Sequence, residues 1–200
     1  MSSENIESGE LRNEINRIGL DMVALRNLNS HNNFAPSPTQ EQYYRDNGST
    51  EDILQYTRPG CSIGVQAEKI TKEYFNLDNR TSTSHDHQKL GKKIEQKTGR
   101  YHANGGEWRW QHIEMQHNWD YLLVCGLDFH GFKFFIIERN QLESILPQLN
   151  AGQGAQGEDG VANPQQGYWF TKSNFTKNNL NFNNYFTELF NEEDLINYIT

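Results

Sequence analysis

The sequence is poor in cysteine and has no long apolar run. Of its 200 residues, only Cys61 and Cys125 are cysteines, and Cys125 lies in an apolar stretch. This favours reduced thiols over a disulfide scaffold, so we expect an intracellular, cytoplasmic protein. No stretch approaches the ~20 apolar residues of a membrane span, and the polar first ten residues show no signal peptide. We therefore expect no membrane association. A G-x-x-x-x-G-K-[ST] loop is also missing, so ATP use is not indicated.

Acidic residues outnumber basic ones over the whole chain, but the charges are unevenly distributed. The formal net charge is -8, which argues against a protein that coats DNA nonspecifically, because such proteins are usually basic. Residues 85–110 nevertheless hold six Lys/Arg against three acids, whereas residues 141–200 hold two against seven. The hydrophobic content of 34% and mean hydropathy of -0.87 predict a modest core, in which aromatic side chains carry much of the burial.

Hydrophobic periodicity predicts alternating helices and strands. Helical spacing occurs over 10–28 and 62–77, a loop is expected over 29–48, and Ser49 is a candidate cap for a short helix over 50–56. Further along, the pattern predicts five strands, at 82–89, 92–101, 108–114, 120–128 and 131–138. The remaining expectations are a helix over 141–149, a flexible loop over 151–167, a short strand over 168–170, a loop over 173–184 and a helix over 186–199.

The most informative residues are Asp86, Glu95 and Lys97. A hairpin that turns between Leu90 and Gly91 would bring Asp86 opposite Glu95, with Cβ atoms about 5 Å apart. Glu95 and Lys97 would share a strand face. Two carboxylates around one hard cation, with an amine beside them, suit phosphodiester hydrolysis. The plainer alternative is an ordinary hairpin in which Glu95 and Lys97 form a solvated face.

At these residues the chain resembles the PD-(D/E)XK nucleases, the superfamily of most type II restriction endonucleases. Asp86 matches the first acidic position, and Glu95-Gln96-Lys97 matches the Asp/Glu-x-Lys element. The order of apolar segments downstream is also similar, so the resemblance covers roughly residues 62–140. Two positions depart from the pattern, because His85 replaces proline and Gln96 replaces an aliphatic residue that packs into the core.

The resemblance implies a fold, a metal and a reaction. The fold would be α/β and restriction-endonuclease-like, a mixed central sheet flanked by helices, with residues 49–200 as the catalytic domain and 1–48 as an N-terminal helix and loop. Mg²⁺ would be held by Asp86, Glu95 and the backbone carbonyl of Gln96, while Lys97 would orient the attacking water. In some relatives a helical glutamate joins the metal site, and Glu68 stands at that place; an exposed helical glutamate is the alternative.

The implied function is a sequence-specific type II restriction endonuclease that cuts double-stranded DNA as a homodimer. Alternatives are a phage or viral nuclease that is structure-specific or degrades DNA, and a non-catalytic DNA-binding protein on the same fold. Candidate DNA contacts are Lys92, Lys93, Arg100, Arg109 and Gln111. The 151–167 loop offers amides that can read base edges, or is a plain insertion.

Two further patterns in the sequence involve its tryptophans and its histidines. Trp108, Trp110 and Trp119 can stack on bases, but we expect at least two of them in the core. A zinc site would need His85 and His87 with ligands from His102, His112, His117 or Cys125, and their spacing matches no known zinc pattern. The histidines 112 and 117 also lack the residue order of a His-Asn-His nuclease.

Overall fold

The computed structural model describes residues 39–103, 106–149, 152–153 and 167–200. The chain divides into two compact units, Met1–Thr39 and Gln40–Thr200, and the second is described here. The helix expected over 10–28 lies outside the described residues, as does most of the loop expected over 151–167.

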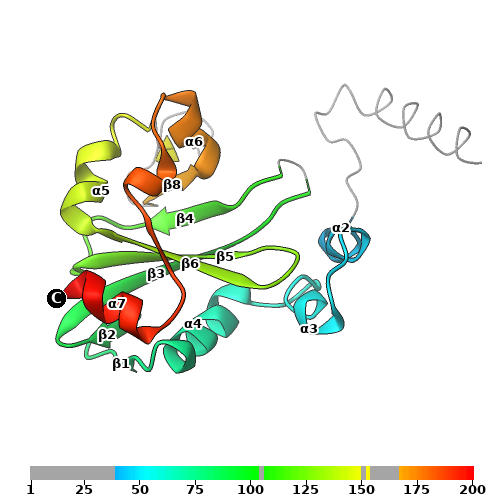
Figure 1. Ribbon diagram of the computed structural model, residues 1–200, viewed down its shortest axis with the longest axis horizontal. Helices are drawn as coiled ribbons and strands as arrows, with labels where there is room; N and C mark the ends of the chain where they lie inside the picture. The colour runs from blue at the N-terminus through cyan, green and yellow to red at the C-terminus, as the bar shows by residue number, and fades with distance from the viewer. Residues whose placement is uncertain (1–38, 104–105, 150–151, 154–166) are drawn as a thin grey trace, which may run out of the picture. The chain divides into compact units, whose positions relative to one another are not determined.

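A six-stranded sheet forms the centre of the second unit (Figure 1). Its strand order is β1-β2-β3-β5-β6-β9, and every neighbouring pair is antiparallel except β3 with β5. The strands are β1 (Asp78–Asn79), β2 (His87–Lys89), β3 (Lys92–Arg100), β5 (Tyr121–Leu127), β6 (Phe132–Glu138) and β9 (Thr187–Leu189). The expected mixed α/β architecture with flanking helices is confirmed at this coarse level, and the sheet is mostly antiparallel.

A second, three-stranded sheet packs against the first. It consists of β4 (Arg109–Ile113), β8 (Tyr168–Thr171) and β7 (Gly152–Gln153), and β4 lies in the connection between the parallel strands β3 and β5. Glycines permit the close approach: a Cβ at Gly99 would lie 2.6 Å from the Arg109 carbonyl oxygen, and one at Gly126 would lie 2.7 Å from the Trp108 ring. Side chains at these two positions would push β4 away from the central sheet.

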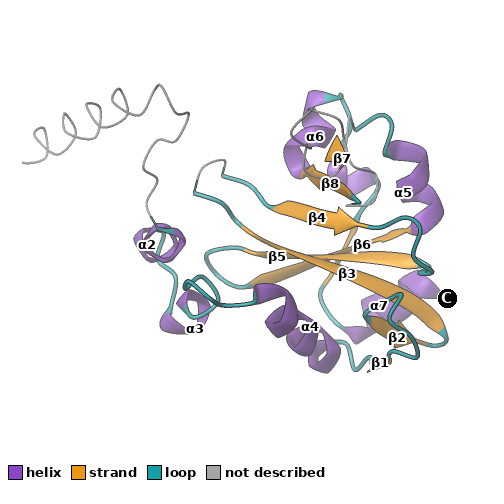
Figure 2. Cartoon of the chain, turned by 180° about the vertical axis from the view of Figure 1, so that it is seen from behind, coloured by secondary structure: helices purple, strands orange, loops and turns teal. Residues whose placement is uncertain are grey.

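Helices cover both faces of the central sheet (Figures 1 and 2). The first face carries α4 (Ile63–Tyr74) and α7 (Glu192–Ile199), whose apolar residues join Ile94, Leu123 and Cys125 in one buried cluster. On the opposite face, α5 (Arg139–Ile145), α6 (Lys172–Lys177) and the 3₁₀ turn η2 (Phe182–Asn184) enclose a second cluster with Leu122 and Val124. The alternation of Leu122, Leu123, Val124 and Cys125 between the two clusters explains why β5 is a continuous apolar run.

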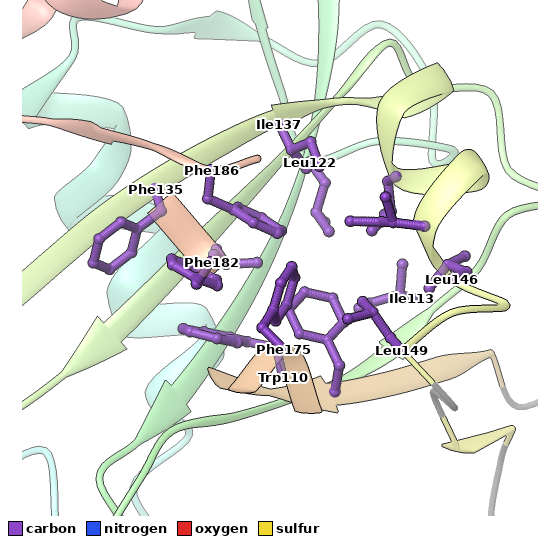
Figure 3. Close-up of a cluster of buried hydrophobic side chains, with 14 of the residues drawn as sticks. Trp110, Ile113, Leu122, Phe135, Ile137, Leu146, Leu149, Phe175, Phe182 and Phe186 are labelled. Atoms are coloured by element: carbon purple, nitrogen blue, oxygen red, sulfur yellow. The ribbon is translucent and has the colours of Figure 1, made fainter. Parts of the chain in front are cut away.

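Aromatic rings dominate the second cluster, as Figure 3 shows for Trp110, Phe175, Phe182 and Phe186. The three tryptophans expected to be core residues or base-stacking platforms are all buried. Their indole N–H groups donate to backbone carbonyls, Trp108 to Leu127, Trp110 to Cys125 and Trp119 to Glu114. The core interpretation is confirmed, and stacking of these rings on bases is wrong because no ring face is accessible.

Several local expectations were wrong because long-range contacts decided the structure. Residues 40–46, expected in a loop, form α2 (Gln40–Asp46), whose buried Tyr44 donates a hydrogen bond to the Leu127 carbonyl at 2.5 Å. The N-cap position of the short helix α3 (Glu51–Leu54) is Thr50 rather than Ser49, and its side chain makes no capping bond. The Ser49 hydroxyl instead donates to the Phe129 carbonyl.

The C-terminal segments differ from the predicted loop and helix for similar reasons. Residues 172–177 form α6, because Thr171 and Asn174 make a capping box and Phe175 is buried. The predicted helix over 186–199 begins at Glu192, since residues 187–189 pair with β6 as an edge strand. The strand expected over 82–89 is confined to His87–Lys89.

Candidate active site

The β2–β3 hairpin has the geometry expected from the sequence. His87 pairs with Ile94 and Lys89 with Lys92, so the next pair outward is Asp86 with Glu95. Leu90 and Gly91 form the turn, and both have positive φ, 51° and 76°. Positive φ at both central residues defines the type I′ turn that suits a two-residue hairpin. The expectation that the chain reverses between Leu90 and Gly91 is confirmed.

Asp86 directly precedes β2, at the open end of the hairpin, and two hydrogen bonds hold it there. Its backbone N–H donates to the Ile94 carbonyl at 3.1 Å, and its Oδ2 accepts the backbone N–H of Gln96 at 2.8 Å. The Gln96 carbonyl points to the same side of β3 as this N–H, because both polar groups of a strand residue share one direction. The carboxylate of Asp86 and the carbonyl proposed as a metal ligand therefore lie along the same edge of β3.

Glu95 and Lys97 share one face of β3, as their spacing predicts. They pair in register with Leu122 and Val124 of β5, so they point to the face that carries β4. The Lys97 Nζ lies 2.6 Å from Glu95 Oε1, and Glu95 is only 4% exposed. Burial raises the pKa of Glu95 above its usual range, the Lys97 charge opposes that rise, and the Asp86 charge adds to it. The solvated-face alternative is wrong for Glu95, because this side chain is buried.

Glu68 lies on α4, on the opposite face of the sheet, yet its charge is coupled to the same residues. Burial raises the pKa of Glu68, and the nearby Asp86 charge raises it further, while Arg80 and Lys97 oppose the rise. Burial is thus the main cause of the raised pKa of Glu68, as it is for Glu95, and the Asp86 charge adds to the rise in both.

A pocket of about 260 Å³ opens between α4 and β1–β2. Its lining includes Glu68 and Asp86 but neither Glu95 nor Lys97, which point to the other face of the sheet. Within the described part of the chain, no group of three or more His, Cys, Asp or Glu side chains is arranged to hold a metal ion. The donors still fit Mg²⁺ in kind, because they are hard carboxylate and carbonyl oxygens. To bind a metal ion, the Glu95 carboxylate would have to release the Lys97 ammonium group.

Gln96, which stands where the PD-(D/E)XK pattern has an aliphatic residue, has a buried polar partner. His87 Nε2 lies 2.9 Å from Gln96 Oε1, and Gln96 Nε2 donates to the Thr98 hydroxyl at 3.2 Å. Burial lowers the pKa of His87, which favours the neutral ring that this bond uses. Sequence reasoning missed this pair, although the hairpin register already placed His87 and Gln96 diagonally across the same face.

Among the described residues, histidines and cysteines form no group that could hold zinc. His85 Nδ1 lies 3.2 Å from the Ser82 hydroxyl and His87 is engaged by Gln96, while Cys125 is fully buried. Burial raises the pKa of the Cys125 thiol, so the thiolate that zinc requires is disfavoured. His117 instead pairs with Glu114 at 3.3 Å.

The basic candidates for DNA contact occupy different places. Lys92 and Lys93 begin β3 beside the hairpin turn, and Lys92 is exposed. Arg100 is not available, because its guanidinium donates to the carbonyls of Tyr56 and Cys61 at 2.6 and 2.9 Å. It ties the segment before α4 to the end of β3, so we assign it a structural role.

The remaining two candidates lie on β4. Arg109 is exposed and its guanidinium lies 5.0 Å from the centre of the Trp169 ring. Gln111 is also exposed, at the register shift between Trp110 and Ile113. Neither residue lines the pocket at Glu68 and Asp86.

Comparison of the chain with protein families, with curated proteins and with solved structures finds no match in any of the three. The described helices include none that is long and apolar enough to cross a membrane.

Proposed function

We propose that the protein is a Mg²⁺-dependent DNA endonuclease that hydrolyses phosphodiester bonds at Asp86, Glu95 and Lys97. One observation carries the proposal. The hairpin register pairs Asp86 with Glu95, the Asp86 carboxylate accepts the backbone N–H of Gln96, and the Lys97 ammonium group lies 2.6 Å from Glu95. Burial raises the pKa of Glu95 and of Glu68, and the Asp86 charge adds to both rises. Carboxyl groups with raised pKa values beside a lysine support a site for proton transfer.

Each residue would have a distinct part in the reaction. Asp86, Glu95 and the Gln96 carbonyl would hold the metal, with Glu68 as a further carboxylate. A bound Mg²⁺ supplies Lewis-acid polarisation of the phosphoryl oxygens and neutralises developing charge. Lys97 would orient the attacking water and stabilise the charge that develops on the phosphate, since its ammonium group already lies at hydrogen-bonding distance from Glu95.

The finer parts of the proposal concern fold, substrate and assembly. We propose a restriction-endonuclease-like sheet, in which the parallel pair β3–β5 follows the Asp86 hairpin as the family order requires. The substrate would be double-stranded DNA, cut in the cytoplasm by a homodimer because two strands need two sites. Lys92 and Lys93, beside the hairpin turn, would contact its phosphates.

Incubation of the full-length protein with plasmid and phage DNA, in Mg²⁺ and in EDTA, tests the activity. Discrete Mg²⁺-dependent fragments on a gel are expected for a sequence-specific enzyme, and a smear would indicate a nuclease that degrades DNA without a fixed site. Retarded but intact DNA with Mg²⁺ and with Mn²⁺ would reject catalysis and favour a DNA-binding protein.

A further inference from the structure

The pocket between α4 and β1–β2 is also lined by basic side chains, which have no part in the reaction proposed above. Lys69 and Lys72 stand three residues apart on α4 and so share one face of the helix. Arg80 follows β1 and faces them across the pocket. The Lys72 ammonium contacts the Asn79 side chain, which holds it against β1.

These three cations lie beside carboxylates in the same pocket. Glu68 and Asp86 line it together with Asp78, and the Arg80 guanidinium approaches Asp86 at 3.9 Å. The Arg80 charge lowers the pKa of Glu68, against the effects of burial and of Asp86. The pocket lining thus carries carboxylates, which attract a divalent cation, and cationic side chains, which attract an anion.

We propose that this pocket is a phosphate-binding subsite, in which Lys69, Lys72 and Arg80 hold a phosphate of the nucleic-acid strand next to Glu68 and Asp86. The inference rests on the proposed function for the identity of the strand. Lysine supplies compact point charges, and arginine supplies a planar fork that matches phosphate oxygens. A divalent cation paired with a phosphate is complementary to both the carboxylates and the cationic side chains of the pocket.

The size of the pocket limits what enters it. Its volume of about 260 Å³ is below the ~300 Å³ at which small-molecule pockets usually begin. We infer that a phosphate with its adjoining sugar lies here and that the bases remain outside. Val65, half exposed at the rim of the pocket, offers an apolar surface to the sugar.

The plain alternative is that Lys69 and Lys72 belong to an ordinary solvated helix face. A binding measurement separates the two interpretations without relying on turnover. Fluorescence anisotropy of a labelled 16-base-pair duplex, in Ca²⁺ and with its integrity checked on a gel, gives the dissociation constant. The test variant is Lys69→Ala/Arg80→Ala, and the control is Lys133→Ala/Lys177→Ala, which removes the same charge from β6 and α6, outside the pocket.

The subsite predicts at least tenfold weaker binding by Lys69→Ala/Arg80→Ala and a twofold change at most in the control. The magnitude of the slope of log K against log[salt] should also fall by up to about 0.9, because the contacts to one phosphate are weakened. Unchanged affinity and an unchanged salt slope in the test variant, or equal losses in both variants, would overturn the subsite. Matching urea midpoints establish that each variant is folded, and Lys69→Gln/Arg80→Gln serves as the second variant if the first is not.

The outcomes for the subsite and for catalysis are distinguishable. Binding that depends on Lys69 and Arg80, without cleavage in Mg²⁺, would reject the endonuclease and retain the subsite. Cleavage in Mg²⁺ with an unchanged KM in Lys69→Ala/Arg80→Ala would reject the subsite and retain the endonuclease.

Discussion

His87 and Gln96 are hydrogen bonded across the β2–β3 hairpin at 2.9 Å, and both side chains are at least 96% buried. This bond lies on the sheet face that α4 covers, opposite to the face of Glu95 and Lys97. It explains how β3 tolerates a polar side chain where an aliphatic one was expected. A buried polar pair is stable only while both partners remain, because either one alone is left unsatisfied.

Replacing Gln96 by leucine should therefore destabilise the protein, although leucine restores the family pattern. We expect a loss of about 1–3 kcal/mol in the free energy of unfolding, since the His87 ring loses its buried partner. Urea denaturation measures this loss. Gln88→Leu, on the same hairpin but half exposed, is the control and should change stability by about 0.5 kcal/mol at most. The double variant His87→Leu/Gln96→Leu should lose less than the sum of the two single variants; simple additivity would contradict the coupling.

The low pKa of His87 makes stability depend on pH. Burial lowers this pKa below the ordinary 6.5, so the unfolded chain binds a proton before the folded protein does. Stability is then complete above about pH 6.5 and is lost as the pH falls from 6.5 through the folded pKa, by up to about 1.4 kcal/mol per pH unit. Urea midpoints at pH 7.5 and 5.5 measure the slope. His87→Gln should reduce it, whereas His130→Gln, in the β5–β6 turn, should not; equal slopes in wild type and His87→Gln would reject the assignment.

The packing of β4 on the central sheet predicts a specific cost at Gly126. An alanine Cβ there would lie 2.7 Å from the buried Trp108 ring, so Gly126→Ala should destabilise by about 1–3 kcal/mol. Gly64→Ala, inside α4 with no atom near its added Cβ, is the matched control and should stabilise by about 0.5–1 kcal/mol. Thermal unfolding distinguishes the two. A neutral Gly126→Ala variant would mean that β4 is not packed on β5 as described.

Much of the hairpin and the central strands was predictable because the signals are local. Leu90-Gly91 sits between two polar strand segments, and the apolar run of β5 marks a strand buried on both faces. The sequence did not reveal that Tyr44 reaches the Leu127 carbonyl or that residues 187–189 join β6, because these pairings connect distant segments. The capping box of Thr171 and Asn174 was a local signal, but the asparagine-rich composition around it favoured a loop.

The hairpin register at the candidate site was predictable, but the surroundings of its residues were not. The sequence predicted that Asp86 lies opposite Glu95 and that Lys97 shares a face of β3 with Glu95. Nothing local indicated that Arg100 would be bound to the carbonyls of Tyr56 and Cys61, or that Glu95 would be covered. Both depend on how the segments before α4 and after β3 fold back on the sheet.

The Mg²⁺ requirement of a Glu68 variant tests whether Glu68 belongs to the metal site. Glu68→Gln removes one charge that Asp86 disfavours, so we expect cleavage to persist but to need a several-fold higher Mg²⁺ concentration for half-maximal rate. Glu73→Gln, on the same helix and exposed, is the control and should leave that concentration unchanged. An identical Mg²⁺ requirement in Glu68→Gln and wild type would remove Glu68 from the metal site and leave it an ordinary helical residue.

The most direct test of the account is the initial rate of plasmid cleavage in Mg²⁺ by wild type, Asp86→Asn and Asp52→Asn, measured side by side. Asparagine at position 86 retains an oxygen that can accept the Gln96 N–H, so the hairpin should keep its structure while losing the carboxylate charge. Asp52, exposed on α3, controls for the loss of one negative charge. The account predicts a rate at least 100-fold lower for Asp86→Asn and an unchanged rate for Asp52→Asn. Cleavage by Asp86→Asn at the wild-type rate, or no Mg²⁺-dependent cleavage by the wild type, would contradict it.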